Sequence, residues 1–120
     1  MPEKDMQETY VRWIRQAASR PKDNKELRER AWKIAHQAAQ LLKERYGVSR
    51  VRVFGSLAKE SGFLQGSDID LAVEGLKLDD YWSAVSSVLY LDDQIPVEIV
   101  DKSECHPYIW TAVEKEGIDL

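Results

Sequence analysis

Two spacings of apolar residues divide this chain into expected helices and strands. Apolar side chains recur every three or four positions in four segments, which is the spacing of one helical face. These segments cover residues 5–19, a stretch capped by Asp23 or Asn24 that ends at Tyr46, a stretch around 80–89, and one from 103–107 to Gly117. Strict alternation and β-branched runs predict strands over residues 49–54, 68–73 and 95–100. Helices alternating with strands predict an α/β fold.

Two carboxylates interrupt the second expected strand. Asp68 and Asp70 alternate with Ile69 and Leu71. On a strand, residues i and i+2 share a face, so the two Asp Cα atoms lie about 6.6 Å apart at about 3.3 Å per residue. Such neighbours repel each other, and either a raised pKa or a bound cation relieves the repulsion. Oxygen ligands suit Mg²⁺, although Asp-x-Asp by itself is also typical of a solvated sheet face.

The end of the first expected strand supplies the second observation. Gly55 and Ser56 follow directly after that strand. Glycine lets a backbone approach a phosphate closely, and serine adds a hydroxyl and an N–H group, although Gly-Ser is also an ordinary turn. The combination of strand, Gly-Ser, loop and Asp-x-Asp favours a triphosphate and metal site.

The stretches Phe54-Gly55-Ser56-Leu57-Ala58-Lys59 and Ser67-Asp68-Ile69-Asp70-Leu71 together carry a family resemblance. They resemble the signature of the DNA polymerase beta-like nucleotidyltransferase superfamily, and the short chain resembles its minimal nucleotidyltransferase branch. That branch includes antitoxins paired with helical HEPN ribonuclease toxins. The resemblance implies a nucleotidyltransferase fold, with a short mixed β-sheet flanked by α-helices. Residues 23–120 are expected to form this domain, and residues 1–22 an N-terminal helix extension.

The resemblance also implies roles for individual residues. Gly55, Ser56, Lys59 and Ser67 match positions that bind the nucleotide. Lys59 keeps the positive charge of an arginine in the family pattern, whereas Glu60 replaces a glycine. A carboxylate near a phosphate loop is unfavourable, so this departure predicts weaker nucleotide affinity.

Three carboxylates are expected to form the catalytic and metal site. Asp68 and Asp70 match the family's metal ligands, which implies a pair of Mg²⁺ ions with ATP as the substrate. The third strand offers Glu98, which matches the family's third acid, and Asp101, which points to the other face and also suits a helix cap with Ser103. We favour Glu98.

Composition narrows the function further. One domain fits 120 residues, and a net charge of −4 with a pI near 5.2 argues against a nucleic-acid backbone as the main partner. The single Cys105 and the lack of a long apolar stretch predict a cytoplasmic protein without a membrane partner. The charged run at 28–30 is interpreted as a solvated helix face.

The expected reaction is transfer of AMP from ATP to a protein hydroxyl, which the resemblance places on a tyrosine of a HEPN toxin. Two alternatives stay open: an antitoxin that neutralises its partner by docking alone, and nucleotidyl transfer to a small molecule. The acceptor, the preferred base and a homo-oligomeric state are left undetermined by the sequence.

Overall fold

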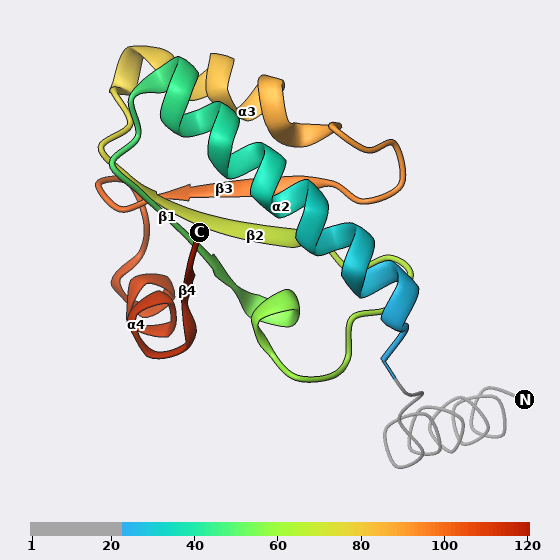
Figure 1. Ribbon diagram of the computed structural model, residues 1–120. Helices are drawn as coiled ribbons and strands as arrows, with labels where there is room; N and C mark the ends of the chain where they lie inside the picture. The colour runs from blue at the N-terminus through green and yellow to red at the C-terminus, as the bar shows by residue number, and fades with distance from the viewer. Residues whose placement is uncertain (1–22) are drawn as a thin grey trace, which may run out of the picture.

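A computed structural model describes residues 23–120, which fold around one four-stranded mixed sheet (Figure 1). The helices and strands, with two short 3-10 helices, follow the chain as α2 (Lys25–Tyr46), β1 (Arg50–Phe54), η1 (Gly55–Ala58), β2 (Ile69–Glu74), η2 (Leu78–Asp80), α3 (Tyr81–Leu89), β3 (Val97–Asp101), α4 (Pro107–Glu116) and β4 (Ile118–Asp119). The strand order is β3-β2-β1-β4. β1 is antiparallel to β2 and β4, while β2 is parallel to β3. The expected mixed α/β fold is therefore confirmed.

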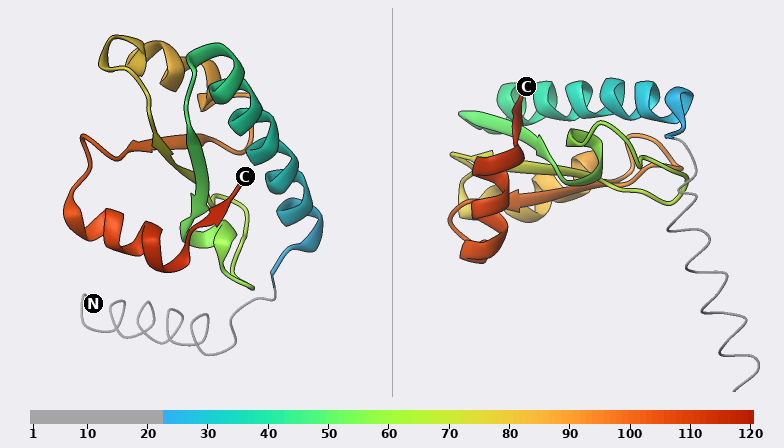
Figure 2. Two further views of the ribbon diagram at one scale, coloured as in Figure 1. Left: turned by 60° about the vertical axis from the view of Figure 1, so that its left-hand side comes forward. Right: turned by 90° about the horizontal axis from the view of Figure 1, so that it is seen from below.

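The long helix α2 lies across one face of the sheet (Figures 1 and 2). It begins after Asn24, whose side-chain oxygen accepts a hydrogen bond from the backbone N–H of Leu27 at 3.1 Å. It ends at Gly47, whose φ of 68° is the left-handed conformation that closes many helices. Its buried stripe consists of Ala31, Ile34, Ala35, Ala38, Ala39 and Leu42.

The core fills the space between α2, α3 and one face of the sheet. Val51 and Val53 of β1 and Ile69, Leu71 and Val73 of β2 are all fully buried. Because side chains alternate between the two faces of a strand, the residues between these buried ones lie on the opposite face of the sheet. Arg52, Asp70 and Glu98 therefore project from the opposite face of the sheet.

Helix α4 lies on that opposite face, so the sheet has helices on both sides (Figure 2). It packs against β1 through Val113, which is fully buried, and through Trp110, whose ring centroid lies 5.2 Å from the guanidinium carbon of Arg52. Glu98, farther along the same face, is exposed. The uncovered part of this face is the part that carries the predicted site.

Several expected boundaries differ from the structure. β2 begins at Ile69, so Asp68 lies just before the strand. β3 begins at Val97, because Pro96 has no N–H for the ladder; its carbonyl accepts from the N–H of Ile69 at 3.0 Å. The two-residue strand β4 was not expected, since so short a segment shows no periodicity. The helix expected over 5–19 and the N-terminal extension lie outside the described residues.

Candidate functional site

Gly55 stands where β1 ends and η1 begins, directly beside Asp70. Its φ of 72° is left-handed, and a Cβ atom at this position would collide with Oδ2 of Asp70. In the β1–β2 register, Phe54 pairs with Asp70, which brings the strand end and the carboxylate together. The glycine is therefore required here for two reasons, its backbone conformation and the space that it leaves open beside the carboxylate.

Asp70 and Glu98 face each other across the parallel strands β2 and β3. They are register partners, so their Cα atoms are separated by one strand spacing of about 4.8 Å, and their side chains share a face. Asp70 is half-buried. Its burial raises the pKa of its carboxyl group to about 6, with further contributions from the charge of Glu98, the charge of Asp68 and a hydrogen bond with Glu98. The structure thus places the three predicted carboxylates in one electrostatic group.

This group suits a nucleotide-bound cation better than an isolated one. Within residues 23–120, no three His, Cys, Asp or Glu side chains converge closely enough to form a metal cage by themselves. Mg²⁺ usually takes only one or two protein carboxylates and completes its shell with water and substrate phosphates. The oxygen-only donors, their mutual repulsion and the open space beside Gly55 fit such an ion.

Asp101, the rival third carboxylate, lies on the core side of β3. It is 5% exposed, and it accepts hydrogen bonds from the backbone N–H of Ser103 at 3.3 Å and from the Ser103 hydroxyl at 3.1 Å. Asp101 pairs in register with Val73, on the face opposite to Asp70. The structure therefore brings Glu98, and not Asp101, beside the Asp-x-Asp pair.

The remaining predicted nucleotide-binding residues border this group. Ser56 is partly exposed in η1, and its carbonyl accepts from the N–H of Lys59 at 3.3 Å. Ser67 closes a tight turn before Asp68: its N–H donates to the carbonyl of Leu64 at 2.9 Å, and its hydroxyl accepts from the Leu64 N–H at 3.1 Å. Lys59 is exposed. These residues lie at the end of the sheet where β1 ends and β2 begins.

The loop between β1 and β2 is held by a clamp that the sequence analysis missed. Arg28 of α2 donates to the carbonyl of Leu57 at 2.9 Å and holds both oxygens of Asp23, at 2.6 and 2.9 Å. Asp23 also accepts from the backbone N–H of Phe63 at 2.7 Å, and the carbonyl of Phe63 accepts from the N–H of Asn24 at 3.2 Å. We call Asp23 and Arg28 the loop clamp. The hydrogen bond from Arg28 is the main reason why the pKa of Asp23 is lowered.

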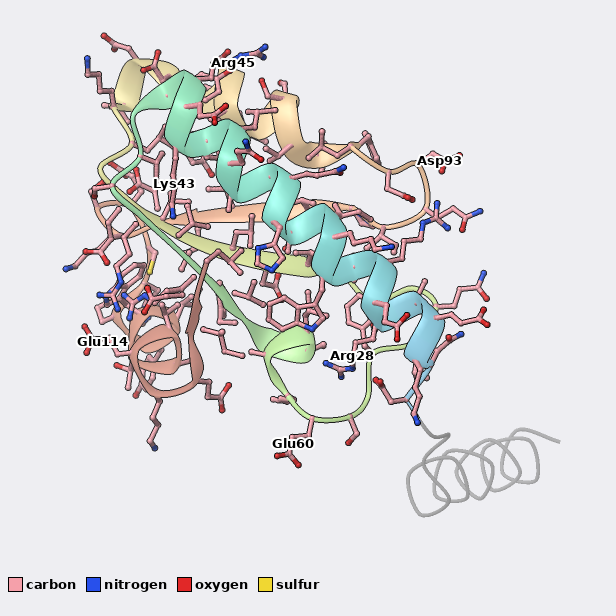
Figure 3. The ribbon with its side chains drawn as sticks, in the orientation of Figure 1. Arg28, Lys43, Arg45, Glu60, Asp93 and Glu114 are labelled. Atoms are coloured by element: carbon pink, nitrogen blue, oxygen red, sulfur yellow. The ribbon has the colours of Figure 1, made fainter. Side chains whose placement is uncertain are left out.

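The interpretation of 28–30 as a solvated face is therefore wrong for Arg28, which is half-buried and points toward η1 (Figure 3). Glu60 lies at the outer tip of the same loop and is exposed (Figure 3). The residues between the two clamped points thus face solvent, while the Gly-Ser segment is fixed to α2. Arg28 and Leu57 lie 29 residues apart in the chain, so no local sequence pattern indicates their contact.

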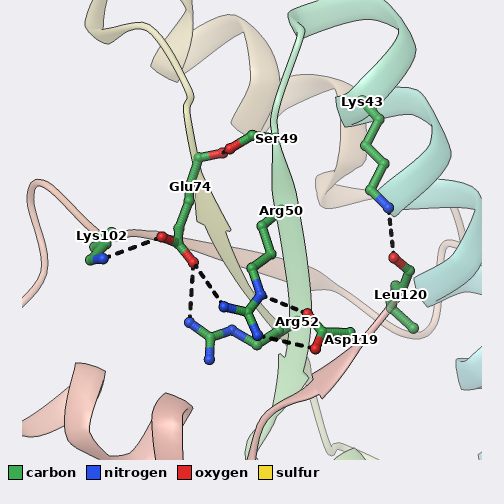
Figure 4. Close-up of polar contacts among 8 residues, drawn as sticks. All are labelled: Lys43, Ser49, Arg50, Arg52, Glu74, Lys102, Asp119 and Leu120. Carbon is green, nitrogen blue, oxygen red and sulfur yellow. Dashed lines mark hydrogen bonds and ion pairs between the residues drawn. The ribbon is translucent and has the colours of Figure 1, made fainter.

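The other end of the same sheet face carries a separate ionic network (Figure 4). Glu74 accepts from Arg52 and from Lys102, each at 3.2 Å, and lies 3.7 Å from Arg50. Arg50 in turn holds Asp119 of β4 at 2.7 and 3.1 Å. These pairs join β1, β2 and β4 with Lys102, which directly follows β3, so they tie the sheet together at the end away from Gly55 and Asp70.

The fold brings the Gly55-Ser56 segment and the carboxylates of Asp70 and Glu98 together at one end of a mixed sheet. Residues 35–119 match the family model described as a nucleotidyltransferase domain. The chain belongs to this nucleotidyltransferase family, in its minimal branch, and is a nucleotidyltransferase.

Named relatives agree with this assignment. Two proteins of Methanocaldococcus jannaschii, each named "putative protein adenylyltransferase", are 34% and 30% identical over 88 residues, covering 71% of this chain and 89% of each relative. A solved structure of a "putative minimal nucleotidyltransferase" is 32% identical with a TM-score of 0.57, covering 82% of this chain and 96% of that chain.

A more distant structure shares the fold. It is a tri-AMPylated Shewanella oneidensis HEPN toxin in complex with an MNT antitoxin, at 19% identity and a TM-score of 0.56, covering 74% of this chain and 70% of that one. Separately, none of the helices in the described part of this chain has the length and apolar character needed to cross a membrane.

Proposed function

We propose that this protein is a Mg²⁺-dependent adenylyltransferase that moves AMP from ATP to a tyrosine hydroxyl of a HEPN toxin and thereby acts as an antitoxin. The observation that carries the proposal is the pairing of Asp70 with Glu98 in strand register, directly beside the space left by Gly55. The relatives named as adenylyltransferases support ATP as the donor. The likeness of fold to an antitoxin bound to an AMPylated toxin supports the choice of acceptor.

The carboxylates fit the metal that this reaction uses. Asp68 and Asp70 would hold Mg²⁺ together with the substrate phosphates, and Glu98 would complete the set. When bound, Mg²⁺ neutralises charge on the phosphates as the leaving group departs. Burial, together with the charges of Glu98 and Asp68, raises the pKa of Asp70 to about 6, so a bound cation would stabilise the ionised form of these carboxylates.

The chain's own residues position the reactants. Backbone groups of Gly55 and the hydroxyl of Ser56 would bind the outer phosphates, with Lys59 adding positive charge at the loop. The acceptor oxygen forms a bond to the α-phosphorus, and the bond from that phosphorus to the bridging oxygen of pyrophosphate breaks. Glu98 is exposed and pairs with Asp70 across the strands. It would orient the acceptor hydroxyl and take its proton.

Co-expression with a HEPN partner tests the proposal. The native chain should add AMP-sized mass increments to a tyrosine of the partner at substoichiometric ratio, as read by mass spectrometry. Asp68→Asn/Asp70→Asn should abolish the increments. Asp79→Asn/Glu104→Gln removes two exposed acids away from the site and should leave them unchanged.

One observation favours docking as the alternative mode of action. Glu60 places a carboxylate in the exposed loop beside the phosphate-binding segment, where the family pattern has glycine. A partner that stays unmodified, and is held inactive equally well by the double variant at one copy per toxin, would establish docking and refute the catalytic proposal.

A further inference from the structure

The outer side of α3 carries an apolar stripe that nothing in residues 23–120 covers. Leu78 and Trp82 are 69% and 76% exposed, and they lie four residues apart where η2 runs directly into α3. Residues four apart lie on the same face of a helix. Val85 and Leu89 continue this face by about one turn each and are half-buried. We call these four residues the α3 stripe.

The inner side of α3 is fixed to the rest of the domain. Ala84 and Val88 are fully buried in the core. The hydroxyl of Tyr46 in α2 forms hydrogen bonds with the hydroxyls of Ser83 at 2.7 Å and Ser87 at 2.8 Å. The α3 stripe therefore points away from these contacts, toward solvent. Tryptophan is enriched among the residues that anchor protein interfaces, and adjoining exposed apolar side chains mark such surfaces.

A short and anchored connection joins α3 to the strand that carries Glu98. Residues 90–96 connect α3 to β3, in which Glu98 is the second residue. Arg30 of α2 donates to Asp92 at 2.7 Å and to Gln94 at 3.2 Å, and the N–H of Gln94 donates to Asp92 at 2.9 Å. A protein that docks on the α3 stripe is therefore held in a defined position relative to Glu98.

The place of β3 in the sheet lets one large partner contact both α3 and the carboxylates. In the order β3-β2-β1-β4, β3 is an edge strand of the described sheet, and α3 packs against it (Figure 1). Glu98 is exposed on the face of β3 that is opposite to the core. A protein resting on α3 needs to extend around only this one edge strand to present a side chain to Glu98.

The small size of the α3 stripe favours a transient protein substrate over a second copy of this chain. An aromatic side chain buries about 150–250 Å² when it is fully covered, so Trp82 and Leu78 together fall far below the roughly 800 Å² per partner of a stable interface. Smaller contacts are typical of transient encounters. An enzyme that modifies a protein has to release it after each transfer, so a small docking surface suits it.

We infer that the α3 stripe is the docking surface for the protein that supplies the acceptor hydroxyl, and that it receives an apolar helix face of that protein. The stripe runs about three turns along one helix, a length that pairs with the apolar face of a second helix. Docking there raises the local concentration of the acceptor at the site. The inference rests on the proposed function, because it names the surface by which the acceptor protein is recognised.

Transfer kinetics with two acceptors test this inference. The acceptors are the intact HEPN partner and a short peptide from it that carries the acceptor tyrosine. Leu78→Ala/Trp82→Ala should raise KM for the intact partner about tenfold or more and leave kcat unchanged, because docking is lost while the reacting groups are kept. The same variant should leave KM for the peptide and for ATP within about twofold. Trp82→Phe should keep most of the affinity for the intact partner.

The matched control is Tyr108→Ala/Ile109→Ala, which removes side chains that are 82% and 41% exposed at the start of α4. It should change none of these constants. An unchanged KM for the intact partner in the α3 variant, or a larger rise in the α4 variant, would overturn the docking surface and leave the proposed function intact.

Two further measurements separate the remaining outcomes. Calorimetry without ATP gives the Kd of the intact partner. A native chain that transfers no AMP, but whose partner affinity falls in the α3 variant, would refute the proposed function and retain the docking surface. Sedimentation of the chain alone gives its mass, and a dimer that the α3 variant converts to a monomer would assign the stripe to a second copy and overturn the inference. Failure of the native chain to bind or modify the partner would overturn both.

Discussion

The ionisation state of Asp70 controls the charge of the proposed site. Its pKa of about 6 in the folded protein exceeds the ordinary value of 3.8, so the native state takes up this proton before the unfolded state does as pH falls. Asp70 therefore makes folding less stable as pH rises from about 4 to about 6, with the full penalty present above that range. This is the opposite of the usual effect of a salt-bridged Asp.

Replacing Asp70 should reveal this penalty directly. Asp70→Asn should raise the melting temperature at pH 8, and the gain should shrink as pH falls through about 6, because the native carboxyl is then protonated as well. Thermal unfolding of both proteins between pH 4.5 and 8 measures the difference, with Asp79→Asn as an exposed control. A gain that stays constant over the whole range would contradict the raised pKa.

Gly47 is a matched control for Gly55. The φ angles of Gly55 and Gly47 are nearly equal, at 72° and 68°, but a Cβ atom at Gly47 would meet open space. Gly55→Ala and Gly47→Ala should each lose about 1 kcal/mol of stability from the left-handed backbone. Only Gly55→Ala should also weaken ATP–Mg²⁺ binding, because its methyl group collides with Asp70. Denaturant unfolding and calorimetry report the two effects, and equal loss of binding in both variants would exclude a special role for Gly55.

Substitution of Glu98 should change the rate of AMP transfer, whereas substitution of Asp101 should change the stability of the fold. Glu98→Gln should lower the rate of AMP transfer about a hundredfold with little change in stability, since the group acts on the reacting hydroxyl. Asp101→Asn should cost about 1 kcal/mol of stability through its bonds to Ser103 and leave transfer nearly intact. Transfer kinetics together with thermal unfolding decide, and the reverse pattern would assign the third carboxylate to Asp101.

The 3-10 helix η1 is held in place by a contact from a distant part of the chain. The loop clamp fixes the carbonyl of Leu57 and the N–H of Phe63 to the start of α2. Arg28→Lys keeps the charge but loses the forked geometry, so ATP–Mg²⁺ affinity should fall several-fold and amide exchange should accelerate between the two clamped points. Arg45→Ala, an exposed change at the far end of α2, is the control. Unaltered exchange in the loop would show that η1 holds its shape without the clamp.

The elements also show where sequence reasoning succeeds and fails. Periodicity located α2 and the three longer strands, because each buries one face, and the faces of β3 placed Glu98 apart from Asp101. The loop clamp was beyond reach, since nothing near Asp23 in sequence indicates that Phe63 will lie beside it. The helix expected around residues 80–89 forms as α3, and it packs through Ala84 and Val88, whereas Trp82 is 76% exposed.

For the whole molecule, the two faces of the sheet are stabilised differently. One is covered by an apolar core, whereas α4 packs on the other through Val113 and through Trp110, whose ring lies 5.2 Å from the guanidinium carbon of Arg52 and 5.6 Å from Nζ of Lys102. Arg52 is only 6% exposed, so its contact with Trp110 is part of the interior. It lies two residues along the strand from the Phe54–Asp70 pair, and is therefore separate from the proposed site.

Substitutions of Trp110 and of the exposed Trp82 test how much the α4 contact stabilises the protein. Trp110→Ala should destabilise the protein by about 2 kcal/mol or more, because it exposes Arg52 and opens the α4 contact. Trp82→Ala should stay within about 0.5 kcal/mol, as expected for an exposed side chain. Denaturant unfolding gives both values. A large effect at Trp82 would mean that α3 depends on a contact that residues 23–120 do not show.

The parallel pairing of β2 with β3 has a consequence for the newly made chain. β1 and β2 form a hairpin from adjacent segments, so Gly55, Asp68 and Asp70 can come together early. Glu98 follows only after the α3 crossover has been synthesised, roughly one to several seconds later at the usual pace of translation. Until then a ribosome-bound chain holds the carboxylates proposed to bind the nucleotide but lacks the one proposed to engage the acceptor, so on this proposal the enzyme becomes competent only when β3 docks.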